Sequence, residues 1–166
     1  MNRKRLLLLT QGGMIAALYV ALTFVFQPIS FGEVQVRIAE ALTVLPMFTP
    51  AAVPGLWVGC LLGNLMGGAM LPDVVFGSLA TLIGAVGTRL LRKAPPWLAV
   101  LPPIVSNMLI VPLVLRYAYG LNYLPLPVMA LSVGAGEVLS CGVLGLVLYR
   151  VLKRADRFRE QQDGER

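Results

Sequence analysis

Histidine is absent from this chain, and cysteine and charged residues are scarce. The 166 residues include no histidine, two cysteines and 13% charged residues, against about 25% charged in an average soluble domain. Without histidine no Cys–His or Ser–His pair can form, and GxSxG, HExxH and GxxxxGK[ST] motifs are also missing. Cys60 and Cys141 stand alone in apolar stretches and are expected to be small core residues. We therefore expect no enzyme, no ATP hydrolysis by this chain, and no metal or cofactor.

Long apolar runs are what the sequence has in place of catalytic motifs. Apolar residues make up 57% of the chain, its mean hydropathy is +0.78, and runs of about 20 residues recur along its length. We predict an all-α integral membrane protein, a compact bundle of about six transmembrane helices. The expected spans are 6–26, 38–48, 51–71, 74–91, 97–115 and 126–152. The second is too short to cross a bilayer alone, so protein must shield it, and the first is expected to be a retained helix.

Basic residues are concentrated at the chain ends and in one loop. Of the 14 Lys and Arg residues, only Arg37 and Arg116 lie elsewhere. The clustered residues are Arg3, Lys4, Arg5, Arg89, Arg92, Lys93, Arg150, Lys153, Arg154, Arg157, Arg159 and Arg166. Cationic clusters that flank apolar spans face the cytoplasm and contact membrane lipid, so we expect both termini to be cytoplasmic and no nucleic-acid partner. Residues 1–152 form the predicted transmembrane domain, and 153–166 a polar cytoplasmic tail.

Small residues recur at helical spacing in three of the expected spans. Glycines at 55, 59, 63 and 67 form one face of the third span, which predicts close helix packing. The first span has a stripe of Gly13, Ala17 and Ala21, and the sixth has Ser132, Gly136 and Ser140. From the residues alone, each stripe is a packing groove, either internal or for a partner helix.

Polar side chains inside the apolar spans mark a candidate binding site. A charge at the bilayer centre costs about 2.5–3.5 kcal/mol, yet Glu40, Asn64, Asn107 and Glu137 fall within expected spans. Further candidates at span ends are Arg37, Asp73, Arg116, Tyr117, Tyr119 and Tyr123. Six spans place most of these groups in the outer half of the bundle, which favours a polar cavity for an organic solute.

A purely structural interpretation of the same residues stays open. Glu40 would then pair with Arg37, and Glu137 with Arg116, while the two asparagines bridge helices. Asp73 follows a proline at the start of the fourth span, where an N-cap aspartate belongs.

The segment between the first two spans changes periodicity. Glu33, Gln35 and Arg37 alternate with apolar residues, which favours an extended cap over the outer mouth. In the alternative, Glu33, Arg37 and Glu40 share one helical face.

Five strings are specific enough to suggest a family. They are Pro28-Ile-Ser-Phe-Gly, Arg37-Ile-Ala-Glu-Ala-Leu-Thr-Val-Leu-Pro46, Pro54-Gly-Leu-Trp-Val-Gly-Cys-Leu-Leu-Gly-Asn64, Asp73-Val-Val-Phe-Gly-Ser-Leu-Ala-Thr-Leu82 and Gly134-Ala-Gly-Glu137. Through them, residues 13–152 resemble the QueT-type substrate-binding (S) components of energy-coupling factor (ECF) transporters.

The resemblance implies a fold, a partner and a solute. Such S components are six-helix subunits of the plasma membrane that bind a vitamin-like solute from outside, and then dock on a module of one transmembrane coupling protein and two ATPases. The bound subunit is thought to topple in the membrane, exposing its site inward. QueT-like members are linked to queuosine salvage, which implies a 7-deazaguanine such as 7-aminomethyl-7-deazaguanine or queuine.

The resemblance also assigns roles to individual residues. An AxxxA motif on the first helix contacts the coupling protein in the wider group, and Ala17 and Ala21 match it, so the stripe with Gly13 becomes a candidate docking face. We expect Glu40 and Glu137 to be the principal solute anchors. The full expected site is Glu40, Glu137, Asn64, Asn107, Arg37, Asp73 and Tyr119.

Two alternatives differ in function. An S component for a thiamine- or pyridoxine-like solute would keep the fold and partners. A self-contained channel or exporter would instead associate with itself through the glycine face of the third span.

Overall fold

The computed structural model describes residues 2–27 and 36–164, with side chains to residue 155. The described residues form helices and no strands. The elements are α1 (Arg3–Val25), the 3-10 helix η1 (Ile38–Met47), α3 (Ala52–Met66), α4 (Leu71–Leu90), α5 (Pro96–Ala99), α6 (Leu101–Tyr117), α7 (Leu126–Glu137), the π-helical segment η2 (Val138–Leu144) and α8 (Gly145–Gly164). Glu33 and Gln35 of the expected cap lie outside the described residues.

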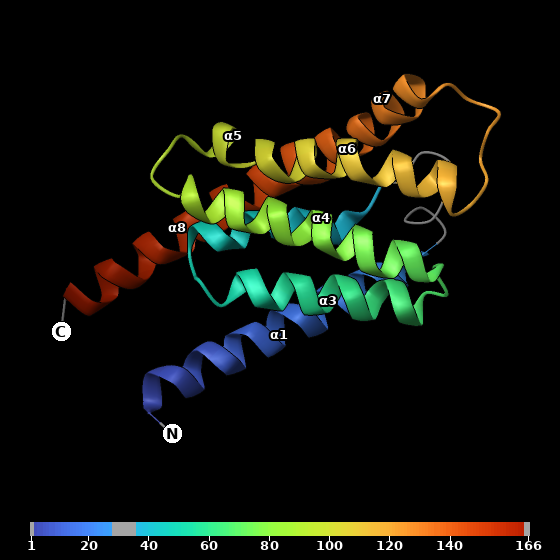
Figure 1. Cartoon of the computed structure of the whole chain (residues 1–166). Helices are drawn as coiled ribbons and strands as arrows, with labels where there is room; N and C mark the ends of the chain where they lie inside the picture. The colour runs from blue at the N-terminus through green and yellow to red at the C-terminus, as the bar shows by residue number, and fades with distance from the viewer. Residues whose placement is uncertain (1, 28–35, 165–166) are drawn as a thin grey trace.

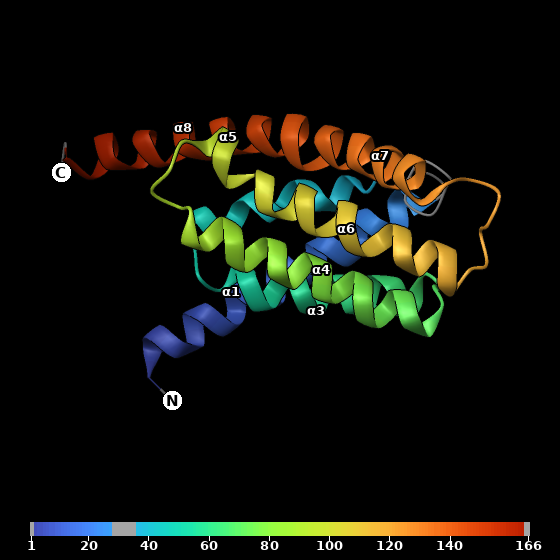
Figure 2. The ribbon, with the colours of Figure 1, turned by 45° about the horizontal axis from the view of Figure 1, so that its top comes forward.

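The helices pack in the order α1, α3, α4, α6 and α7, and α7 continues through η2 into α8 (Figures 1 and 2). Within the described part of the chain, four stretches are long and apolar enough to cross a membrane: Arg3–Val25, Leu71–Leu90, Pro96–Tyr117 and Leu126–Ala155. The shorter apolar helices η1 and α3 bring the count to the six helices that the sequence predicts. The predicted fold class is confirmed.

The short second helix is shielded by protein, as its length requires. η1 contacts α1, α3, α4, α8 and η2, and seven of its ten residues are buried. It is a 3-10 helix with Pro46 near its end, and a rise of about 2.0 Å per residue makes it longer than an α-helix of the same residue count. This element places Glu40 at the centre of the bundle, where its exposed fraction is 0%.

Glycine and proline account for two boundaries that differ from the predicted spans. The third helix stops at Met66, before the predicted 71, and the chain turns at Gly68 with φ of +77°, a conformation that glycine adopts readily. Near the fifth span, a short α5 precedes α6, and α6 has Pro102 in its first turn. Proline fits the first turn because that N–H has no partner within the helix.

The glycine face of α3 packs against α1. A Cβ atom on Gly55 would lie 2.7 Å from the carbonyl oxygen of Gly12, and one on Gly59 would lie 2.8 Å from the Cβ of Tyr19. Gly63 faces Thr23 in the same way. The prediction of close packing is confirmed. The alternative hypothesis, in which the chain associates with itself through this glycine face, is wrong because α1 covers the face.

A second glycine contact, absent from the sequence-based expectations, joins α4 to α6. A Cβ on Gly84 would lie 2.5 Å from the Cα of Pro103, and one on Gly87 would lie 2.4 Å from the Cβ of Pro102. The two helices therefore approach closely along their backbones.

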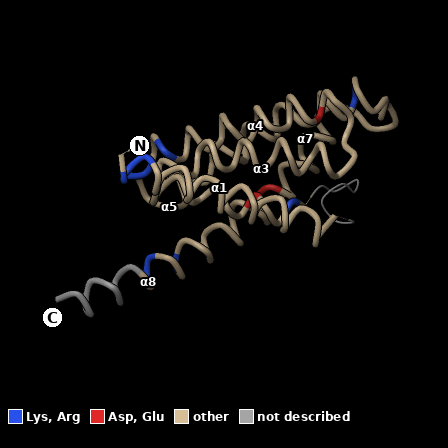
Figure 3. Tube along the Cα trace, turned by 90° about the horizontal axis from the view of Figure 1, so that it is seen from below, with Lys and Arg blue, Asp and Glu red and all other residues tan. Residues whose placement is uncertain are grey.

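The basic clusters meet at one end of the bundle. The start of α1, the end of α8 and the α4–α5 connection lie at this end in Figures 1 and 2, and Figure 3 shows Lys and Arg gathered there. The starts of α4 and α7 lie at the opposite end, which we call the distal end. The charge asymmetry that the sequence predicts is present in the fold.

Candidate functional site

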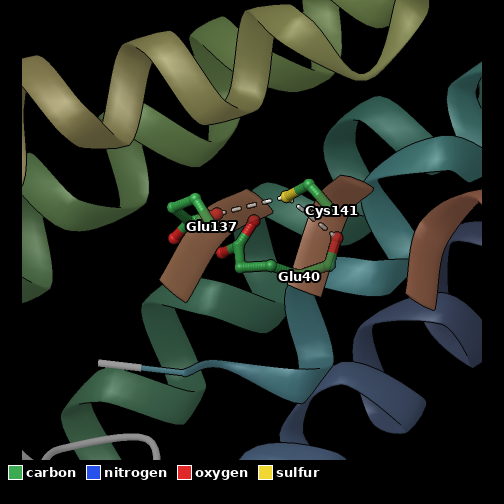
Figure 4. Close-up of side chains that lie close together, drawn as sticks. All are labelled: Glu40, Glu137 and Cys141. Atoms are coloured by element: carbon green, nitrogen blue, oxygen red, sulfur yellow. Dashed lines mark hydrogen bonds between the residues drawn. The ribbon is translucent and has the colours of Figure 1, made fainter. Parts of the chain in front are cut away.

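Two glutamates from distant parts of the chain meet inside the bundle. Glu40 is on η1 and Glu137 is the last residue of α7, and their exposed fractions are 0% and 3%. One carboxylate oxygen of each, together with the Sγ of Cys141, lies within 4.8 Å of the others (Figure 4). We call Glu40 and Glu137 the acidic pair. The sequence singled out both residues, and the fold brings them together.

Hydroxyl donors hold one side of the Glu40 carboxylate. The hydroxyls of Tyr19 on α1 and Thr81 on α4 both donate to Oε1, the latter at 3.0 Å. The other oxygen, Oε2, has no hydrogen-bond partner within the described part of the chain. The carboxylate therefore keeps accepting capacity inside an apolar bundle.

The donors to Glu137 come from its own helix and from α6. The Cys141 thiol, one turn further along, donates to Oε2 at 3.1 Å, and Asn107 makes a side-chain hydrogen bond to the carboxylate. Thr43 on η1 donates to the Glu40 carbonyl at 2.6 Å and contacts the Cys141 Sγ at 3.3 Å. Cys141 is buried as expected, but it is also part of this polar network.

A second group of polar side chains, the distal cluster, consists of Arg37, Asp73, Asn64 and Tyr119. An Arg37 guanidinium nitrogen lies 3.6 Å from Asp73 Oδ2, and these side chains are only 7% and 1% exposed. Asn64 donates to the Asp73 carbonyl at 3.3 Å, and the Tyr119 hydroxyl donates to Asp73 Oδ2 at 3.2 Å. The cluster thus joins α3, α4, the start of η1 and the chain after α6.

Tyr119 lies in the connection between α6 and α7, outside the membrane-length helices. Its hydroxyl also accepts from the Met70 backbone N–H at 3.1 Å. Burial raises the pKa of this hydroxyl above its ordinary value, so at neutral pH it stays protonated and can donate to Asp73.

Two pairings and one helix-cap assignment of the structural interpretation are wrong. Arg37 forms its ion pair with Asp73 and not with Glu40, and the described residues show no ion pair between Glu137 and Arg116. Asp73 is not an N-cap: Met70 holds that position, because the helix starts one residue before Pro72. Asp73 therefore lies in the first turn, and its carboxylate meets Arg37 in the bundle interior.

Several site residues were missed or assigned only loosely from the sequence. Thr43 and Thr81 were not among the expected residues; the signal that marks them is a hydroxyl side chain within an apolar helix. Tyr19, an aromatic residue of the first span, joins the site through its hydroxyl. Tyr117 and Tyr123 are 79% and 58% exposed and take no part in either cluster.

The bundle also carries an apolar groove away from these clusters. It has a volume of about 490 Å³ and lies between α4 and α6, lined by side chains such as Phe76, Leu79 and Ile83. These three are 38–55% exposed, so the groove opens to the outside of the bundle, where lipid lies in a membrane. No residue of the acidic pair or the distal cluster lines it.

The fold and the site define a multi-pass helical membrane protein with a polar site buried among its helices. Comparison with known proteins then identifies the family within this class. The family described as QueT transporter matches residues 9–154, and the chain belongs to that family.

One curated relative, also a QueT protein, is similar in sequence to this chain over part of its length. The chain is 34% identical over 71 residues to the queuosine precursor transporter QueT of Lactococcus lactis subsp. cremoris (strain MG1363). The match covers 42% of this chain and 41% of that relative. No solved structure matches the chain.

Proposed function

We propose that this chain is the substrate-binding subunit of a transporter for a queuosine precursor, a 7-deazaguanine such as 7-aminomethyl-7-deazaguanine or queuine. The observation that carries the proposal is the buried polar network of the acidic pair and the distal cluster, which draws on α1, η1, α3, α4, α6 and α7. The family is one of transporters, and the relative is named for a queuosine precursor. The site is therefore proposed to bind its solute without converting it.

The chemistry of the network suits a guanine-like base. The N1–H and the exocyclic amine of such an edge are donors, which the carboxylate of Glu40 or Glu137 can accept. Its 6-oxo group is an acceptor, which Asn64, Asn107 or Arg37 can satisfy. A solute in the site would take over hydrogen bonds that these side chains now make to one another. A site that pairs every buried polar group rejects analogues lacking one of them.

The test of this function is calorimetric binding to the purified protein in detergent, with 7-aminomethyl-7-deazaguanine, queuine, guanine and thiamine as ligands. We expect nanomolar binding, about −12 kcal/mol, for one deazaguanine and much weaker binding for guanine. Binding of thiamine but of no deazaguanine would move the assignment to another vitamin-like solute while leaving the membrane fold unchanged.

An ATP-driven ECF module, one transmembrane coupling protein and two ATPases, is the proposed partner. The stripe of Gly13, Ala17 and Ala21 on α1 is exposed, and a Cβ on Gly13 would meet nothing within 4 Å. By contrast, the side of α1 that carries Ala16 and Tyr19 is buried against α3. An open row of small residues is the surface on which another membrane helix can pack closely.

Replacing Ala17 by leucine tests this docking face. We expect solute binding by the isolated subunit to be unchanged, because Ala17 points away from the polar network. Uptake with the module should fall by about tenfold or more, the equivalent of about 1.4 kcal/mol of lost packing. Ala155→Leu, which adds the same side chain at an exposed position of α8, is the matched control. Equal uptake by both variants would remove the stripe from the interface.

The subunit is proposed to lie in the plasma membrane with both termini and the α4–α5 loop in the cytoplasm. The support is the gathering of Lys and Arg at one end of the bundle, since positive loops stay cytoplasmic. Residues 1–152 would then form the transmembrane domain and 153–166 a cytoplasmic tail. A reporter enzyme fused to either end checks the orientation.

A further inference from the structure

The buried charges of the described residues do not balance. Four strongly charged side chains are buried: Arg37, Glu40, Asp73 and Glu137. Arg37 lies against Asp73. No Lys or Arg of the described chain lies within 4.0 Å of either member of the acidic pair. Two carboxylates therefore share the bundle interior with no cation in direct contact with either, an arrangement that costs free energy unless a proton or a positive group joins them.

The contacts of the acidic pair leave hydrogen-bonding capacity for such a group. Tyr19 and Thr81 both donate to Oε1 of Glu40, and Oε2 of this fully buried side chain has no partner in the described chain. Figure 4 shows the two carboxylates directed toward each other, with Cys141 beside them. The oxygen without a partner and the close approach of a second buried carboxylate thus occur at the same residue, Glu40.

We propose that Glu40 and Glu137 form a cation subsite that holds the protonated amine of the transported solute. The proposal rests on the proposed function and specifies it: the solute is a deazaguanine carrying an ammonium group, and not a neutral one. An ammonium has three N–H donors and a compact positive charge, so it can donate to both carboxylates at once. The uncharged edge of the solute would then be shared between the remaining carboxylate oxygens and the distal cluster, whose Arg37 and Asp73 already balance each other.

Besides a proton, a metal ion is another source of positive charge. The set of two carboxylates and one thiol could hold a divalent ion, but the thiol would have to lose the proton that it now donates to Glu137. An ammonium needs no such change. The experiment therefore includes metal ions as a separate arm.

The test compares two ligands that differ mainly in charge at one substituent, 7-aminomethyl-7-deazaguanine and the neutral 7-cyano-7-deazaguanine. We expect wild-type protein to bind the aminomethyl compound about 100-fold more tightly, as two charge-assisted hydrogen bonds allow. In Glu137→Gln this ratio should fall below about 10, because the carboxamide keeps the shape and loses the charge. Glu160→Gln, in the predicted polar tail, removes the same charge elsewhere and should keep the wild-type ratio. The wild-type comparison needs no variant to fold.

Three outcomes overturn the subsite, and they are distinguishable. Tight and equal binding of both compounds removes the cation subsite and leaves the proposed function standing. Binding of neither compound, and none of queuine, removes the proposed function and the subsite with it. Stoichiometric Zn²⁺ or Mg²⁺ binding that Glu137→Gln abolishes, with ligand binding lost after chelation, assigns the acidic pair to a metal ion instead of the amine.

Discussion

Replacing Gly84 by leucine is expected to lower the free energy of unfolding by about 3 kcal/mol or more. A single Cβ at this position would already lie 2.5 Å from the Cα and 2.8 Å from the Cβ of Pro103. The backbone of α6 cannot move out of the way as a flexible side chain would, so α4 and α6 would have to separate. The measurement is the thermal unfolding midpoint of the purified variant in detergent.

Gly13→Leu is the matched control for this substitution. Gly13 also lies within a helix, but a Cβ there would meet nothing within 4 Å. Leucine has a higher helix propensity than glycine, so this variant should be as stable as the wild type or slightly more stable. If both variants unfolded at the same temperature, the close contact between α4 and α6 would be refuted.

The second large effect is expected at the buried ion pair. Arg37→Met leaves Asp73 charged and without its cation inside the bundle, and removal of one member of a buried pair costs about 3–5 kcal/mol. Asp73→Leu likewise leaves the Arg37 guanidinium inside the bundle without the Asp73 carboxylate. Each single variant should therefore be strongly destabilised and should bind a deazaguanine at least about 100-fold more weakly.

The double variant separates stability from recognition. Because Arg37→Met with Asp73→Leu removes both charges, its loss of stability should be smaller than the two single losses added together. Solute binding should not recover, since both polar groups proposed to contact the solute are gone. Thermal unfolding and calorimetry on the wild type, the two single variants and the double variant complete this double-mutant cycle. Strictly additive stability losses would contradict a direct interaction between the two side chains.

The spans and their order could be predicted from the sequence because lipid imposes a simple rule. The length of an apolar run predicts a membrane helix. This rule located the stretches of α1, α4, α6 and the α7–α8 helix without any tertiary information. The same rule required η1 to be shielded. It did not indicate that this segment is a 3-10 helix, because that geometry depends on the packing of η1 against five other elements.

The residues of the site were easier to predict than the side chains with which they interact. Glu40 and Glu137 stood out because a carboxylate in an apolar span needs an explanation. Which groups satisfy them depends on how helices far apart in the chain meet. Arg37 was assigned to Glu40 by proximity in sequence, yet it pairs with Asp73, which lies 36 positions further along. Thr81 and Cys141 joined the network through the same long-range packing.

The gathering of positive charge at one end of the bundle restricts how the molecule can move in a membrane. Arg3, Lys4 and Arg5 begin α1, and Arg92 and Lys93 follow α4; all five are exposed. Carrying each such side chain through hydrocarbon costs about 2.5–3.5 kcal/mol, whereas the distal end has few charges to move. Any reorientation that turns the site inward would therefore pivot about the basic end, which stays at the lipid headgroups, while the distal end travels through the bilayer.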